Sequence, residues 1–226
     1  MFTFDPLNIL VKLNVFLETI MVQITHGGEN IEKISDILAA AQKRFGKYGL
    51  EKTSVSEIAA DLNMSKGSIY YYFPDKESLY KAVIEKEHGE FLQKVKDQIQ
   101  DMDNPVEMVQ AYLKVNLQYF RILLNLSRVR FTDLVYNPII KEIIEVFRKR
   151  EVELLCGIIM KGSEKMVFNV SNPEEMANLY LDLLKGLRKI IIGRNEIFYL
   201  ENEEYELMVQ RVNLFSDIFI KGLMYR

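Results

Sequence analysis

The chain has 226 residues, and 49% of them are hydrophobic, a fraction that excludes a disordered polypeptide and allows one large domain or two modest ones. The net charge of −3 excludes a strongly basic chain, and the single cysteine excludes an intramolecular disulfide and suits a reducing cytoplasm. The two histidines fall outside ligand-like spacing, so we expect no metal and no cofactor. Five prolines and long stretches of helical periodicity predict an all-α protein.

Residues 1–30 form an N-terminal extension that is mostly apolar from Leu7 to Ile24. It lacks the basic start and the cleavage site of a signal peptide, and Lys12 and Glu18 weaken a membrane span. We expect an extra helix packed on the protein's own surface or on a dimer partner, with no stable membrane association. Two alternatives stay open: a translated upstream segment with the true start at Met21, and a membrane-associated regulator that uses residues 7–24.

A first helix is predicted from about Ile31 to Tyr48, and Gly49 suits the left-handed position that ends such a helix. Its inward face has apolar residues at helical spacing, namely Ile34, Leu38, Ala41 and Phe45.

Two short helices joined by a turn are predicted next. Ser54 with Glu57 three residues later has the pattern of a capping box, and residues 55–62 carry an apolar stripe. Residues 63–65 form the turn, with Ser65 as the next N-cap. The second helix ends at Phe73, because Pro74 disfavours helical geometry in the residue before it. Two helices joined by such a turn are typical of helix-turn-helix DNA-binding proteins.

The second of these helices is rich in groups that bind phosphate and sugar. Hydroxyls and one ammonium stand on Ser65, Lys66, Ser68, Tyr70, Tyr71 and Tyr72, while Gly67 allows the backbone to approach a duplex closely. Ile69 and Phe73 are expected to face the core. The alternative from composition alone is a helical hairpin whose tyrosines only cover that core.

The run from Ile31 to about Lys86 resembles the DNA-binding domain of the TetR family of transcriptional regulators. The matching segments are ILAAAQKRFGKYG (37–49), TSVSEIA (53–59) and MSKGSIYYYFPDKESL (64–79). Tyr72 is a minor departure, since His is common there. The resemblance implies a DNA-binding domain at 31–76 and DNA contacts from Thr53, Ser65, Lys66, Ser68, Tyr70, Tyr71, Tyr72 and Lys76. Ser54 and Gly67 join this set because of their positions near helix starts.

Residues 77–226 are expected to form a larger helical domain for ligand binding and dimerisation. A long helix from Asp75 to about Met102 links it to the first domain, and Pro105 begins the next helix. Further helices are predicted near 105–124, 126–136, 138–163, 173–194 and 203–224. TetR-like regulators dimerise through their last two helices, which implies an interface of Leu183, Leu187, Ile190, Ile191, Val212, Phe215, Ile218, Phe219 and Leu223; the alternative is that these residues are monomer core.

The helices between 105 and 163 are where a ligand pocket is expected, because such cavities are apolar with a few polar anchors. The candidate lining residues are Tyr112, Tyr119, Phe120, Phe131, Tyr136, Phe147 and Met160. For each of them, ordinary core packing is the competing interpretation.

The sequence therefore predicts a cytoplasmic, nucleoid-associated homodimer that binds a palindromic DNA operator and is released by a small apolar or aromatic effector. The alternative is a TetR-like DNA-binding protein without a small-molecule effector, such as a nucleoid or division factor. An enzyme is not expected, because no acid/base pair, nucleophile constellation, phosphate loop or metal spacing is present.

Overall fold

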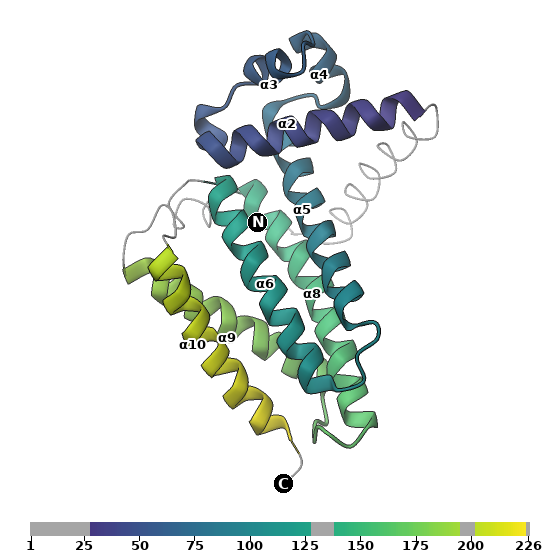
Figure 1. The fold of residues 1–226 in the computed structure, drawn as a ribbon, viewed down its shortest axis with the longest axis vertical. Helices are drawn as coiled ribbons and strands as arrows, with labels where there is room; N and C mark the ends of the chain where they lie inside the picture. Colours follow the sequence, from purple (N-terminus) through teal and green to yellow (C-terminus); the bar gives the residue numbers. More distant parts are fainter. Residues whose placement is uncertain (1–27, 128–137, 195–201, 225–226) are drawn as a thin grey trace, which may run out of the picture.

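The computed structural model describes residues 28–127, 138–194 and 202–224, and these residues form eight helices (Figure 1). The first domain contains α2 (Gly28–Lys52), α3 (Val55–Asp61) and α4 (Lys66–Tyr72), and α5 (Lys76–Ile99) leads out of it. The second contains α6 (Pro105–Ser127), α8 (Pro138–Glu164), α9 (Pro173–Arg194) and α10 (Asn202–Leu223). The predicted all-α class is confirmed. The helix expected within residues 1–27 lies outside the described residues.

Most helix starts follow from their capping residues, as predicted. Asp75 accepts a hydrogen bond from the Ser78 amide at 2.6 Å at the start of α5, and the side chain of Asn104 accepts one from the Val106 amide at 3.0 Å at the start of α6. Gly49 interrupts α2 with φ 80° and ψ 168°, backbone angles that favour glycine. The sequence thus predicts where α5 and α6 begin, whereas the predicted end of the first helix at Gly49 is a bend, because α2 continues to Lys52.

The predicted break at Asn125 is wrong, because α6 continues through it to Ser127. Asparagine weakens a helix by only a fraction of a kcal/mol, and tertiary packing overrides such a preference. Leu123 packs against both apolar cores of the molecule, so the end of α6 is held from two sides. The rest of the helix predicted at 126–136 lies outside the described residues.

Two apolar cores hold the molecule together. The head core contains buried residues of α2, α3, α4 and the first half of α5, with Ile143 and Phe147 of α8. The body core contains buried residues of the second half of α5 and of the four later helices. In Figure 1, α2 lies across the upper ends of α5, α6 and α8, with α3 and α4 beyond it at one end of the molecule. Helix α5 therefore belongs to both cores.

The boundary between the two domains, expected after residue 76, stays a prediction.

No described helix combines the length and hydropathy needed to cross a bilayer.

Candidate nucleic-acid interface

Helices α3 and α4 are seven residues long each, and the turn between them has Asn63 in the left-handed region (φ 53°). Ser54 starts α3: its hydroxyl accepts a hydrogen bond from the Glu57 amide at 3.3 Å, and the Glu57 carboxylate accepts one from the Ser54 amide at 2.9 Å. Ser65 starts α4, with its hydroxyl accepting from the Ser68 amide at 3.0 Å. The predicted capping box and both predicted N-caps are confirmed, so residues within a few positions of each start are enough to set these helices.

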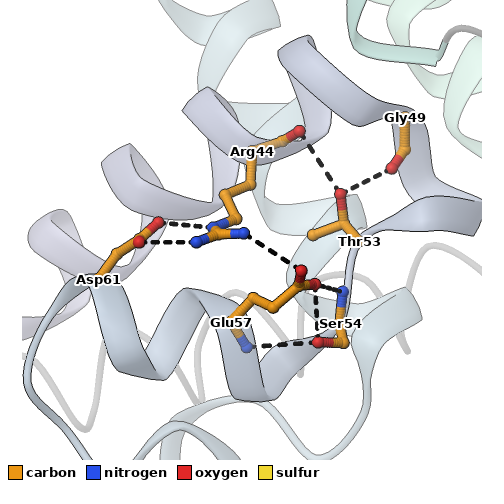
Figure 2. Close-up of polar contacts among 6 residues, drawn as sticks. All are labelled: Arg44, Gly49, Thr53, Ser54, Glu57 and Asp61. Carbon is orange, nitrogen blue, oxygen red and sulfur yellow. Dashed lines mark hydrogen bonds and ion pairs between the residues drawn. The ribbon is translucent and has the colours of Figure 1, made fainter.

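Arg44 of α2 fixes the position of α3 (Figure 2). Its guanidinium donates to both oxygens of Asp61, at 2.6 and 2.7 Å, and lies 3.4 Å from Glu57. The hydrogen bond from Arg44 lowers the pKa of Asp61, while the Ser54 amide and hydroxyl are the main cause of the lowered pKa of Glu57. Because Glu57 and Asp61 are four residues apart on one helical face, a single guanidinium holds both.

Helix α4 is anchored on one side and open on the other. Ile69 is fully buried and Phe73, its C-cap, is 2% exposed, as predicted. Among its other side chains, Tyr71 is 70% exposed and Tyr70 is 38% exposed, and the ammonium of Lys66 lies 5.4 Å from the centre of the Tyr70 ring. The arrangement presents one cation and two phenols at the end of the molecule, groups suited to phosphate, sugar and base edges.

Several predicted contact residues already have protein partners. Tyr72 donates its hydroxyl to the Asn30 side chain at 3.0 Å, and Lys76 donates to the Leu50 carbonyl at 3.0 Å. The hydroxyls of Ser65 and Ser68 lie 2.7 Å apart. Gly67 is exposed, and a Cβ there meets only the Ser65 hydroxyl, at 3.7 Å, so the backbone at this position faces open space.

Thr53 is buried in this subunit, and its contact with DNA stays a prediction. It is only 3% exposed, and its hydroxyl donates to the Gly49 carbonyl at 2.8 Å (Figure 2). The bent backbone at Gly49 leaves a carbonyl that this hydroxyl satisfies, so the side chain ties α2 to the start of α3.

Sequence reasoning missed the role of Arg44 and the polar link between α2 and α5. In that link Gln42 donates to the buried carboxyl of Glu87 and accepts from Lys86 at 3.3 Å. For Arg44, the sequence carries one signal, the acidic pair at 57 and 61, because two carboxylates on one face of a short helix favour a shared cation.

Comparisons with known proteins agree on one family. The family described as bacterial regulatory proteins, tetR family, matches residues 37–83. The crystal structure of a transcriptional regulator from Cytophaga hutchinsonii superposes with a TM-score of 0.80 at 36% identity, over 85% of this chain and 99% of that one. This chain belongs to the TetR family of transcriptional regulators.

Two other relatives cover most of the chain. The HTH-type transcriptional regulator QacR of Staphylococcus aureus is 25% identical over 190 residues, 83% of this chain and 96% of QacR. A transcriptional regulator of Saccharomonospora viridis, solved in complex with choline, has a TM-score of 0.67 at 18% identity, over 86% of this chain and 99% of that one, a likeness that shows the fold alone. Being a TetR-family member, the chain is a DNA-binding regulator of transcription and not an enzyme.

In this TetR-family body, the predicted pocket residues differ in exposure. Tyr112, Tyr119 and Phe147 are buried, and Phe120 is half-buried. Met160 is 48% exposed on α8, and its place in a ligand pocket stays a prediction. Phe131 and Tyr136 lie outside the described residues. The buried members come together with polar side chains that the sequence did not single out.

The predicted dimerisation residues of the TetR-family fold also divide by exposure. Leu183, Ile190 and Ile218 are large apolar side chains with 43%, 54% and 63% exposure. Leu187, Phe215 and Phe219 are half-buried, whereas Ile191, Val212 and Leu223 lie in the subunit's own core. In this subunit, therefore, only part of the predicted set is exposed on α9 and α10.

Proposed function

We propose that the protein is a homodimeric, ligand-released repressor that binds a palindromic operator. The observation that carries the proposal is the open side of α4, where Lys66, Tyr70 and Tyr71 are exposed while Ile69 anchors the helix. An anchored helix with an exposed polar side at the end of a molecule is suited to the major groove. Four other predicted contact residues already make hydrogen bonds within the protein, and to contact DNA they would have to share these bonds with phosphate. They are Ser54, Ser65, Tyr72 and Lys76.

Dimerisation is proposed through α9 and α10. Leu183 and Ile190 on α9 and Ile218 on α10 are exposed at helical spacing, and large exposed apolar groups on one surface are typical of interaction sites. Two α4 helices related by a twofold axis would be set about one DNA turn apart, ~34–36 Å. A dimer also doubles the phosphate contacts, which matters because residues 31–86 hold nine basic against eight acidic side chains.

Release is proposed to be a population shift. Helix α5 contributes to both cores, so a change in the packing of the body alters the position of the head. An effector that binds one head position better than the other then changes the affinity for DNA, and its difference in affinity for the two positions limits the size of the change. A structural neighbour was solved in complex with choline, but at 18% identity the likeness shows the fold alone. The effector class of this chain therefore has to come from its own residues.

The test is titration of a labelled DNA fragment from upstream of the gene, followed by fluorescence anisotropy at several salt concentrations. Lys66→Ala should weaken binding and lower the salt slope by about 1 for each subunit, because a phosphate contact is lost. Lys114→Ala, an exposed lysine of α6, is the matched control and should leave the slope unchanged. Equal slopes for wild type and Lys66→Ala would contradict the phosphate role.

The dimer is tested by sedimentation of wild type and Ile218→Lys. A charge at this exposed apolar position should give monomers, whereas Met166→Lys, at a 78% exposed position in the segment between α8 and α9, should leave dimers. A wild-type monomer that fails to retain the fragment in dilute buffer would refute the proposal. Retention that no small molecule reverses would favour a DNA-binding protein without an effector.

A further inference from the structure

The body core contains a cluster of buried polar atoms without partners among the described residues. These atoms are both ring nitrogens of His88 on α5, the hydroxyl of Tyr119 on α6 and Nε of Arg188 on α9. Native proteins satisfy about 90% or more of their buried polar groups, with water or a ligand where protein groups are lacking. Three residues from three helices therefore carry hydrogen-bonding groups that their protein neighbours leave unmet.

Glu151 of α8 connects these residues: it faces His88, it is linked to Arg188 through Asn116, and its charge acts on Tyr119. Asn116 donates to one oxygen of this carboxylate at 2.8 Å, and the Tyr112 hydroxyl donates to the same oxygen. The second oxygen faces His88 Nε2 at 3.7 Å, which is too long for a hydrogen bond. Arg188 donates to the side-chain oxygen of Asn116, so the side-chain amide of Asn116 links the guanidinium to the carboxylate.

Flat rings form the apolar part of this cluster. The His88 ring stacks on Phe147 with 3.7 Å between centroids, and Tyr119 stacks on Phe91 at 4.7 Å. The Arg188 guanidinium lies 4.4 Å from the centre of the Phe120 ring. The two stacked pairs are tilted against each other, with 55° between the His88 and Tyr119 rings, so the unmet hydrogen-bonding groups lie among aromatic rings, which favour an occupant with an aromatic body.

The unmet groups also define the polarity of the occupant. Arg188 Nε–H is always a donor, and burial keeps Tyr119 a protonated phenol by raising its pKa. Burial lowers the pKa of His88, which favours the neutral ring with one donor and one acceptor. The occupant must therefore accept hydrogen bonds from at least two donors, which a quaternary ammonium without acceptor atoms does not do.

The charges of the cluster exclude strongly ionic occupants. Glu151 and Arg188 already supply one negative and one positive group, joined through Asn116. Any further ion, of either sign, would leave the cluster with a net buried charge, at a high desolvation cost.

We propose that His88, Tyr119 and Arg188 form the binding site of an uncharged aromatic molecule that carries a carbonyl or hydroxyl group. This inference rests on the proposed function, since it names the effector class of the repressor. The site lies next to the head: Glu87, adjacent to His88, accepts a hydrogen bond from Gln42 of α2, and Phe147 belongs to the head core. A molecule that displaces the His88 ring thus acts on residues that hold α2.

The test uses three molecules with the same rings and different charge: naphthamide, naphthoate and naphthylmethylammonium. Isothermal titration of the full-length protein should detect naphthamide and give at least tenfold weaker binding for the two ions. Tyr119→Phe should weaken naphthamide binding about tenfold through loss of one hydrogen bond. The same variant should keep or raise the melting temperature of the ligand-free protein, because it removes a buried hydroxyl without a partner, and a purely structural role predicts the opposite.

Tyr180→Phe is the matched control. The Tyr180 hydroxyl bonds to Ser216 at 2.9 Å elsewhere in the body core, so this variant should lower the melting temperature and change naphthamide affinity less than twofold. The inference is overturned if none of the three molecules binds, which would mean a site filled by water only. It is also overturned if an ion binds as tightly as the amide, or if Tyr119→Phe binds naphthamide like wild type.

Anisotropy of the upstream DNA fragment in the same samples separates this inference from the proposed function. Retention of DNA without amide binding overturns the ligand site and leaves the DNA-binding proposal standing. Amide binding by a protein that retains no DNA supports the site and overturns the repressor.

Discussion

Replacement of Ile69 by alanine should release α4 from the head. This helix has seven residues, whereas isolated helices shorter than about 12–15 residues are marginal in water, so packing has to hold it in place. Ile69 is its one buried residue and is fully buried. Three buried carbon groups are lost at about 0.8 kcal/mol each, and the cavity left behind raises the expected cost to about 3–4 kcal/mol.

The assay is urea denaturation followed by circular dichroism at one fixed protein concentration, because the proposed dimerisation would make apparent stability depend on concentration. The same samples are titrated with the upstream DNA fragment, and Ile69→Ala should lose more than tenfold in affinity. Tyr71→Ala is the comparison: at 70% exposure it should change the free energy of unfolding by no more than about 0.5 kcal/mol and still weaken DNA binding. The reasoning fails if Ile69→Ala unfolds like wild type, or if Tyr71→Ala is equally destabilising.

Two further predictions concern the frame that supports α4. Gly49→Ala should cost about 1–3 kcal/mol in urea unfolding, since φ 80° with ψ 168° is a region that only glycine adopts readily. Gly89→Ala in α5, where an added Cβ meets nothing within 4 Å, should instead stabilise by about 0.5–1 kcal/mol, and equal effects at the two sites would contradict the backbone argument. The lowered pKa values of Glu57 and Asp61 mean that their contribution to stability is present above the unfolded pKa values of about 4 and is lost as pH falls through the folded ones. Wild type should therefore be more stable than Asp61→Asn at pH 7, and melting curves should converge toward pH 3; a constant difference would exclude this linkage.

The helix boundaries of the head follow from local rules in the sequence. Capping by Ser54, Ser65 and Asp75 involves residues within three positions, and Pro74 acts on its immediate neighbour. These helix boundaries can therefore be predicted without knowledge of the tertiary structure. The spacing of Ile69 and Phe73 likewise gives the buried side of α4.

The remaining contacts depend on how the helices cross. The position of Thr53 suits either a cap or a phosphate contact, and only the nearby Gly49 carbonyl turns its hydroxyl inward. Arg44 meets Asp61 across two helices, at a distance in sequence where no spacing rule applies. The body site is harder still, because Glu151 and Arg188 come from helices whose relative rotation the periodicity of each helix leaves undetermined.

The continuity of α5 limits how this regulator can be recombined with others. The helix has 24 residues, about 36 Å, and runs without a linker from the head core, through Leu79 and Val83, to the body core at Phe91 and Val95 (Figure 1). One residue inserted between these segments would turn the head by about 100° against the body, whereas seven would return it to within about 20°. A chimaera that combines the head of one relative with the body of another must therefore join the two α5 segments so that the head keeps its rotation about the helix axis.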